Sequence, residues 1–490
     1  MTFHGLGYLL LSEHGKRLGL QPPLRVATPY ERLNLLEDAA GLSEEHARRV
    51  LTEISRLKRQ GGQPDANSDL LRYLHAYNAA MRALFLVDYD DLVTLTVELL
   101  AQCADLKQRC RELYRWISVD EFQDVDDRQY ALVRLLAPPD GNICAIGDPD
   151  QAIYSFRGSD TRFFQQFPRD FPSARVIQLR RNYRSTATIL AAALEIVAPV
   201  SLVEDRQLEA SMPGSEKITV HESPTDRAEA EFVVHTIEQM LGGATFFSFD
   251  SRRVAGGEDE ETSRSFGDFA VLYRTSEQAA TLQEAFMRSG LPFQCRSHAS
   301  LADSSWVRTL VRELQGMPDN ESVVGRVERS LARLKLPEIE DEHSALAALR
   351  ALARRTHNIA QFLSELAMGI DADLWDPRGD RVSLLTLHAS KGLEFPVVFI
   401  VGCEDGVLPL QWGTKKENLE EERRLFFVGM TRCRERLFLT YARRRHWRGS
   451  VRTMRPSPFL TELREALLTR SRAPGGVHKA APKHEQLNLF

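Results

Sequence analysis

Cysteine is scarce in this sequence of 490 residues, and long apolar runs are absent. The six cysteines, at 103, 110, 144, 295, 403 and 433, form no C-x-x-C pair, which argues against zinc sites, iron–sulfur clusters and disulfide frameworks. No apolar stretch approaches the roughly 18 residues of a membrane-spanning helix, and the run 6–11 lacks the basic flank of a signal peptide. We therefore expect a cytoplasmic protein without membrane contact.

A phosphate-binding loop is also missing. The pattern G-x-x-x-x-G-K-[ST], whose backbone N–H groups and lysine hold nucleotide phosphates, does not occur. The one Gly-Lys pair, Gly15-Lys16, is followed by Arg17 and preceded by no glycine-rich turn. We expect that the sequence, which starts at Met1, leaves no room upstream for such a loop and its strand.

Two short apolar runs nevertheless end in acidic clusters. Residues 116–119 lead into Asp120 and Glu121, and residues 142–146 lead into a segment that ends at Gln151. Such runs favour buried parallel strands, whose carboxyl ends share one ligand-binding edge. There Asp120 suits Mg²⁺, Glu121 suits a base that orients water, and Gln151 suits a terminal phosphate of ATP. An Asp-Glu pair alone is more often a helix cap. The presence of Gln151 after the next strand favours a role in nucleotide hydrolysis instead.

The chain as a whole predicts an α/β fold. Apolar residues (43%) and charged residues (27%) are typical of globular domains, and the length favours about three. Strands alternate with helical stretches, which favours two parallel sheets, while the tail from position 470 has the composition of a disordered segment. The predicted strands are 115–119, 142–146, 175–179, 269–273, 382–387, 397–401 and 437–441.

Positive charge is concentrated near the end of the second half. The net charge is −5, but residues 423–455 contain eleven arginines, no lysine and one acid, Glu435. An arginine stripe is what contacts with a phosphate backbone require. A solvated cationic face is the alternative, although it would favour lysine mixed with glutamate.

Six segments together resemble the motifs of superfamily-1A DNA helicases of the UvrD/PcrA/Rep type. They occur in the family's order from Thr2 to about Pro456, with motif I absent. The segments are 2–6 (motif Ia), 119–124 (motif II), 147–158 (motif III), 179–185 (motif IV), 385–395 (motif V) and 421–432 (motif VI). The resemblance implies two RecA-like parallel-sheet domains of the P-loop NTPase type, the first one incomplete, each with a helical insertion.

The resemblance also implies domain boundaries. Residues 1–18 and 91–178 would form the first core, with 19–90 as its short insertion. Residues 179–300 and 378–460 would form the second core, with 301–377 as a reduced insertion. Residues 461–490 would be a C-terminal helix and a disordered tail. Both insertions are shorter than is usual in the family, which puts the engagement of duplex DNA in question.

Residue roles follow from the same resemblance, with ATP and Mg²⁺ as cofactors. Arg184 and Arg432 match two arginine fingers, for which surface ion pairing is the alternative. Tyr183 matches the aromatic that stacks on adenine, while Glu394 matches the ribose carboxylate and Gly392 lies in the same motif. The positions that match contacts with single-stranded DNA and ss/ds junctions are Thr2, Phe3, His4, Tyr154, Phe156, Arg157, Thr386 and His388; such aromatics are otherwise often core residues.

These features favour an ATP-dependent 3′-to-5′ DNA helicase of repair or replication that lacks its phosphate loop. The alternative is a DNA-binding relative that does not hydrolyse ATP. A helicase–nuclease subunit finds no support, because nothing after residue 460 has the pattern of a nuclease. The terminal residues Gln486, Leu487, Leu489 and Phe490 resemble the bacterial sliding-clamp pentapeptide Gln-Leu-x-Leu-Phe, a match that short motifs also reach by chance.

Overall fold

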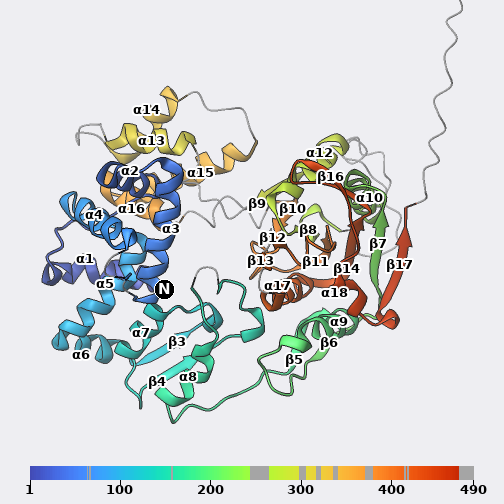
Figure 1. The fold of residues 1–490 in the computed structure, drawn as a ribbon, viewed down its shortest axis with the longest axis horizontal. Coiled ribbons are helices and arrows are strands. Elements are labelled where there is room, and N and C mark those ends of the chain that lie inside the picture. The colour runs from blue at the N-terminus through green and yellow to red at the C-terminus, as the bar shows by residue number, and fades with distance from the viewer. Residues whose placement is uncertain are drawn as a thin grey trace, which may run out of the picture. The chain divides into compact units, whose positions relative to one another are not determined.

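The computed structural model describes residues 1–62, 64–65, 68–155, 158–242, 264–296, 305–315, 322–334, 340–369, 379–412, 415–416 and 419–473. Its helices and strands confirm the α/β class (Figure 1). Two compact units make up the chain. Unit 1 comprises residues 1–180, 197–208 and 294–379, and unit 2 comprises 181–196, 209–293 and 380–490.

Unit 1 is mostly helical in the part that the structure describes, and its strands form two short parallel pairs. In the larger pair, Trp116 lies opposite Asn142 and Val119 lies opposite Ala145. The elements are α1 (Phe3–His14), β1 (Arg25–Val26), α2 (Pro29–Ala40), α3 (Glu44–Gln60), α4 (Asp69–Ala83), β2 (Leu86–Val87), α5 (Tyr89–Gln102), α6 (Ala104–Leu113), β3 (Trp116–Val119), α7 (Asp127–Leu136), β4 (Asn142–Ala145), α8 (Arg162–Asp170), α13 (Ser305–Gln315), α14 (Val323–Arg333), α15 (Glu340–Arg355) and α16 (Ile359–Gly369).

Capping residues set where several of these helices begin. Helices α2, α5 and α7 are capped by Thr28, Asp88 and Asp126, respectively. Each cap side chain accepts the backbone N–H of the third residue of its helix, and the side chain of that third residue accepts the backbone N–H of the cap. Such capping boxes satisfy N–H groups that the helix itself leaves unpaired. Helix α7 therefore starts at a fixed point after β3 and packs beside the strand that carries the acidic pair.

Helices α13 to α16 belong to unit 1 by their contacts, although in sequence they lie between strands of the other sheet. Ser364 of α16 accepts the backbone N–H of Val26 at 3.0 Å. Arg312 of α13 donates to the hydroxyl of Tyr30 in α2, and its guanidinium lies 5.4 Å from the centre of that ring. The second predicted insertion thus packs against the helices that follow α1.

Unit 2 is built on a seven-stranded sheet with the order β17-β7-β14-β11-β8-β10-β9. Each strand pairing that is described in it is parallel, with Val398 opposite both Ala270 and Leu437. The elements are β5 (Arg181–Thr186), α9 (Ala187–Val197), β6 (Glu209–Met212), β7 (Ile218–Ser223), α10 (Asp226–Met240), β8 (Phe269–Tyr273), α12 (Ala279–Ser289), β9 (Phe293–Arg296), β10 (Val382–Thr386), β11 (Phe395–Ile400), β12 (Gln411–Trp412), β13 (Lys415–Lys416), α17 (Leu419–Met430), β14 (Cys433–Ala442), β15 (Arg444–Trp447), β16 (Ser450–Thr453), α18 (Pro458–Glu462) and β17 (Leu468–Arg472).

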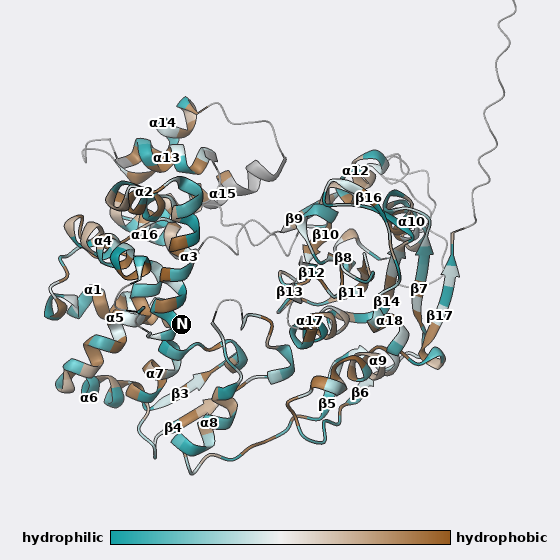
Figure 2. Ribbon diagram, viewed as in Figure 1, coloured by the Kyte–Doolittle hydropathy of each residue, from teal (hydrophilic) through white to brown (hydrophobic). Residues whose placement is uncertain are grey.

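One predicted strand is wrong. Residues 175–179 form no strand, and every residue from 172 to 180 is exposed. The segment is apolar, as the brown stretch between α8 and β5 shows in Figure 2. An extended run becomes a strand only where a neighbouring edge hydrogen-bonds to it, and none of the described strands of unit 1 pairs with this run.

Candidate functional site

The predicted acidic pair lies at the carboxyl end of β3, exposed to solvent. Asp120 Oδ1 accepts the backbone N–H of Glu121 at 2.9 Å. Glu121 has φ 50° and ψ 44°, a left-handed conformation that costs an L-residue with a Cβ about 1–2 kcal/mol. Backbone strain of this kind accumulates at functional sites, so Glu121 is the first candidate for a catalytic group.

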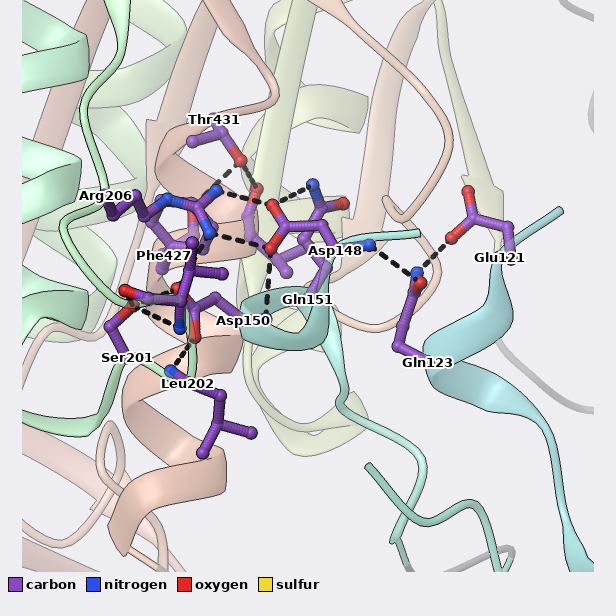
Figure 3. Close-up of polar contacts among 12 residues, drawn as sticks. Glu121, Gln123, Asp148, Asp150, Gln151, Ser201, Leu202, Arg206, Phe427 and Thr431 are labelled. Atoms are coloured by element: carbon purple, nitrogen blue, oxygen red, sulfur yellow. Dashed lines mark hydrogen bonds and ion pairs between the residues drawn. The ribbon is translucent and has the colours of Figure 1, made fainter. Parts of the chain in front are cut away.

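Gln123 connects this pair to the loop after β4. Its amide nitrogen donates to Glu121 Oε2, and its oxygen accepts the backbone N–H of Asp148 at 3.0 Å (Figure 3). The contact depends on Gly147, because a Cβ at that position would lie 2.4 Å from the same oxygen. The backbone of Phe122 adds a 2.9 Å bond to the carbonyl of Ile146. The ends of the two strands are therefore held together.

Asp148 is the centre of the loop that carries Gln151. Its Oδ2 accepts the side-chain amide of Gln151 at 3.0 Å, and Arg206 donates to both of its oxygens, at 2.8 and 2.6 Å. Arg206 also donates to the fully buried Asp150 at 2.8 Å, which in turn accepts the hydroxyl of Ser201 (Figure 3). Burial alone would raise the pKa of Asp148, but the hydrogen bonds and charge of Arg206 hold it below its usual value.

Sequence reasoning missed Arg206. It stands 58 residues from Asp148 in a segment without strand or helix pattern, so no local signal marks it. The two acids of motif III do not single it out either, because the chain has 63 lysines and arginines that could neutralise them. Its effect is to fix the loop from which Gln151 projects.

The predicted DNA-contacting residues of the first motif lie at the start of α1. Thr2 caps the helix by accepting the N–H of Gly5 at 3.0 Å. His4 stacks on Tyr89 with ring centres 3.8 Å apart, and Phe3 is half-buried against the apolar core. Burial, and secondarily a neighbouring arginine, lower the pKa of His4 to about 4, so the ring is neutral at pH 7. Tyr154, in the loop after Gln151, is half-buried.

Unit 2 brings two of the predicted nucleotide contacts together. Arg184 and Glu394 form an ion pair, although 210 residues separate them. Tyr183, beside Arg184 in β5, is 68% exposed. Gly392 has φ +81°, a turn conformation that favours glycine, and it precedes Glu394 by two residues.

Arg432 lies deeper than a surface ion pair would. Its side chain is 1% exposed and donates to the carbonyls of Val428 at 2.9 Å and Leu393 at 3.3 Å. Its own carbonyl accepts the N–H of Phe395 at 2.9 Å, which joins the end of α17 to the strand after Glu394. The structure therefore excludes the alternative of an exposed pair for this residue.

Two further predicted contacts follow β10 in unit 2. The hydroxyl of Thr386 accepts the N–H of Ala389 at 3.1 Å, and this capping bond orders the turn in which His388 is half-buried. Several of the predicted site residues lie outside the described residues: Phe156, Arg157, Gln486, Leu487, Leu489 and Phe490.

Only part of the arginine stripe at residues 423–455 is exposed on the surface. Arg445 is buried and paired with Glu229 and Glu404, and Arg423 is buried against Glu462. These arginines hold the fold together, so interpreting the entire run as phosphate contacts is wrong. A buried guanidinium needs carboxylate partners, and these come from α10, α18 and the segment after β11. The members of the run that remain exposed are Arg443, Arg444, Arg452 and Arg455.

The described residues show neither a ready-made metal site nor a helix able to span a membrane. Those residues include no group of three or more His, Cys, Asp or Glu side chains placed to hold a metal ion. Asp120 and Glu121 offer hard carboxylate oxygens, which fit Mg²⁺ when water and phosphate oxygens complete its octahedral shell. None of the described helices combines the length and the apolar character needed to span a bilayer.

Two family models together match most of the chain. The family model of the UvrD/REP helicase N-terminal domain matches residues 1–172, and that of the UvrD-like helicase C-terminal domain matches 177–321 and 329–444. The ATP-dependent DNA helicase PcrA of Staphylococcus aureus (strain Mu50 / ATCC 700699) is 27% identical over 575 residues, with 95% of this chain and 76% of the relative covered. PcrA of Leuconostoc citreum is 26% identical, with 95% and 74% covered. A solved C-terminal domain of a possible DNA helicase from Lactobacillus plantarum WCFS1 covers 59% of this chain and 98% of its own, with 16% identity and a TM-score of 0.27. The chain belongs to the UvrD/Rep family of ATP-dependent DNA helicases.

Proposed function

We propose that this chain forms the motor domains of a cytoplasmic helicase. The helicase would move 3′ to 5′ along single-stranded DNA in repair or replication. One observation carries the proposal: Gln123 and Asp148 join Glu121 to Gln151 in a continuous hydrogen-bonded network. The network supports it because a base for water and an amide for a phosphate are held in fixed register at neighbouring strand ends.

The chemical roles follow from the groups. Bound ATP with Mg²⁺ would supply the phosphoanhydride bond and part of the charge neutralisation. Glu121 would orient the attacking water and take its proton, and Gln151 would donate to a phosphate oxygen. Arg184 and Arg432 would stabilise the charge that develops during transfer, while Asp120 would bind the metal through its water shell. Positioning by charge and hydrogen bonds is nearly all that phosphoryl transfer requires.

The nucleoside would be held by unit 2. Tyr183 offers an exposed ring for adenine, and Glu394, next to the Gly392 turn, offers a carboxylate for the ribose hydroxyls. Glu394 is paired with Arg184, so nucleotide binding would exchange this ion pair for contacts to ribose and phosphate.

Single-stranded DNA and its junctions with duplex are the proposed substrate. The contacting groups are Thr2, Phe3, His4, Tyr154, Phe156, Arg157, Thr386 and His388. Binding of a labelled oligo-dT should fall steeply with salt through counterion release, and Tyr154→Ala with Phe156→Ala should weaken it by about tenfold or more. Tyr73→Ala in α4 is the matched control. A flat salt dependence, or equal binding by the double variant, would contradict the DNA interface.

Hydrolysis by the 490-residue chain alone should be far below a helicase rate, because no loop in the sequence cradles the phosphates. The same absence favours the second candidate, a DNA-binding family member that does not hydrolyse ATP. Steady-state ATPase with saturating single-stranded DNA tests both. Strong DNA-stimulated turnover that Glu121→Gln abolishes would show that this chain needs no outside loop.

A sliding clamp is the proposed partner of the C-terminal segment. Gln486, Leu487, Leu489 and Phe490 would dock as a short apolar anchor into a preformed pocket. A peptide of residues 476–490 should bind a bacterial clamp in a polarisation assay. Leu489→Ala with Phe490→Ala should remove that binding, and an unchanged affinity would rule out the anchor.

A further inference from the structure

Two arginines of unit 1 lack the acceptors that other enclosed arginines have in the described part of the chain. The Nε atoms of Arg59 and Arg128 are buried without a hydrogen bond, and their terminal nitrogens form none with the described residues. Arg206 also has a buried Nε, but its terminal nitrogens donate to Asp148 and Asp150. Because an enclosed cation without acceptors is costly, the guanidinium groups of Arg59 and Arg128 are suited to an anion from outside the chain.

Arg59 lies beside both of the predicted DNA-contacting segments of unit 1. A Cβ at Gly158, four residues after Tyr154, would lie 4.0 Å from the Cβ of Arg59. Burial lowers the pKa of His4, and the charge of Arg59 lowers it further, so the guanidinium is also near the imidazole ring. Arg59 is the penultimate residue of α3, and its side chain is 27% exposed. A strand that contacts either segment therefore passes within reach of this side chain.

Arg128 adds a second cation at the same end of α3. It is the second residue of α7, a helix that packs against α3. A Cβ at Gly61, which caps α3, would lie 2.6 Å from Arg128 Cζ, so glycine at this position lets the guanidinium lie against the helix end. A cation in the first turn of a helix is disfavoured by the helix dipole, and a bound anion would offset that cost.

The acids around these two arginines already have other partners. The Asp90 carboxylate lies 3.9 Å from Arg59 Nε, beyond hydrogen-bond distance, and its other oxygen lies 3.9 Å from Arg32. Asp126 is buried and caps α7 by accepting the backbone N–H of Gln129 at 2.8 Å. Two planar guanidinium groups with unused N–H donors match the oxygens of a phosphate.

We propose that Arg59 and Arg128 together bind one backbone phosphate of single-stranded DNA. Tyr154 would stack on a base nearby, while the two guanidinium groups fix the position of the strand without reading its sequence. Neither arginine belongs to the six segments that resemble family motifs. The inference rests on the proposed function, because it adds a phosphate site to the proposed DNA interface.

The test measures binding of labelled oligo-dT to the full chain by fluorescence anisotropy across a salt series. Arg59→Gln with Arg128→Gln should weaken binding by about tenfold at about 0.1 M salt, and should lower the slope of log K against log salt by about 0.7, the value for one phosphate contact on a single strand. Arg59→Lys with Arg128→Lys keeps both charges and should retain most of the slope.

Matched controls come from the same two helices. Arg56 in α3 and Arg134 in α7 are exposed and form ion pairs with Glu53 and Asp170. Arg56→Gln with Arg134→Gln removes the same net charge and should leave the salt slope unchanged. Urea unfolding checks that the variants fold. If the double Gln variant unfolds early, each single variant at 59 and 128 carries the same comparison.

A second readout locates the contact on the strand. Oligo-dT with one neutral methylphosphonate linkage at successive positions should lose about fivefold in affinity for the parent at a single linkage. The double Gln variant should bind that oligonucleotide no worse than the others, because the interaction is already gone. A variant that only loosened the fold would bind every oligonucleotide more weakly and would keep the sensitivity to that linkage.

The outcomes separate this inference from the proposed function. A steep salt slope in the parent that the double Gln variant keeps, or a methylphosphonate effect that survives in it, would overturn the phosphate site and leave the DNA interface standing. Inorganic phosphate should compete no better than chloride at equal ionic strength. Stronger competition by phosphate in the parent alone would show a site for the free anion and would also overturn the proposal. A flat slope in the parent would contradict the proposed function and this inference with it.

Discussion

Parallel strands occur in both units, and each begins as a short apolar run, but the two sheets differ in what surrounds them. In unit 2 all five residues of β8 and all five of β10 are buried, and β8 lies between two other strands. In unit 1 only Val119 of β3 is buried, and Trp116 in the same strand is almost fully exposed. Neighbouring elements, more than the strand's own residues, therefore decide whether a β-forming sequence becomes core.

The largest effect is expected where a side chain in the core of unit 2 is truncated. Phe399 in β11 is fully buried and stacks on Phe438 with ring centres 4.5 Å apart. Phe399→Ala should lower the free energy of unfolding by about 3–5 kcal/mol, through lost burial and a cavity that cannot collapse. Urea unfolding, followed by hydrogen exchange in unit 2, measures the loss.

The matching change in unit 1 is Trp116→Ala, which removes a larger side chain from a strand in the same kind of sheet. Because Trp116 is mostly in water, we expect a change within about 0.5 kcal/mol. A loss comparable with that of Phe399→Ala would show that the sheet face in unit 1 is covered, and the contrast between the units would fail.

The same contrast explains which strands could be predicted. Apolar runs such as 269–273 and 382–387 became strands because each found a partner on both sides. The run 175–179 has a similar pattern and no described partner, so its prediction is wrong. Strand β17 was missed because Arg470 and Arg472 give it the composition of a tail, while pairing with β7 supplies the order. The periodicity of apolar residues shows only that a segment can form a strand. Whether it forms one depends on hydrogen bonds to partner strands that lie far along the chain.

The second prediction concerns Arg206, the residue that stabilises the loop of Gln151 in unit 1. Arg206→Ala leaves Asp148 and Asp150 without their cation and should cost about 2–3 kcal/mol. Hydrogen exchange at residues 148–152 should rise accordingly. Arg162→Ala breaks an exposed pair with Asp127 and should change stability by less than about 1 kcal/mol.

The acid dependence of stability gives an independent check on the ion pair of Arg206 with Asp148. The pKa of Asp148 is lowered in the folded state, so its contribution is present at neutral pH and is lost as the pH falls below its usual value. Arg206→Ala should therefore remove part of the acid sensitivity of this loop. Equal acid sensitivity in the variant would mean that another cation holds Asp148.

The site shows a similar division between what sequence patterns reveal and what they hide. Asp120, Glu121 and Gln151 could be predicted as candidates because their spacing relative to two strands is local. Arg206 and the bridging role of Gln123 could not be found, since both depend on how the loop after β4 folds back. The burial of Arg445 was hidden for the same reason: a run of arginines looks alike whether its carboxylate partners are near or absent.

A pH-dependent effect in unit 1 is the third prediction. Burial raises the pKa of Asp126 to about 6, against the opposing hydrogen bonds of the α7 N-terminus. The folded state thus binds a proton more tightly than the unfolded state, and the contribution of Asp126 to stability decreases as the pH rises through 6. Asp126→Asn keeps a good helix cap and removes the buried charge, so it should stabilise unit 1 by about 1–2 kcal/mol at pH 7.5.

The measurement is urea unfolding at pH 5 and pH 7.5, with hydrogen exchange of α7 as the local readout. The gain of Asp126→Asn over the parent should be smaller at pH 5, where the parent carboxyl is largely protonated. A gain that does not depend on pH would show that the substitution acts through the cap instead of through the buried charge.

The smallest expected effect is at Glu121, whose backbone has a left-handed conformation at the end of β3. Glu121→Gly removes the left-handed penalty but gives the unfolded chain more freedom, so the net gain in stability should be about 0.5–1 kcal/mol. Glu45→Gly, on the exposed face of α3, should instead lose about 1 kcal/mol because glycine weakens a helix. Urea unfolding of both variants gives the comparison. If Glu121→Gly is destabilising, the bond from Gln123 outweighs the strain, and the conformation of Glu121 is a product of local packing rather than a feature retained for catalysis.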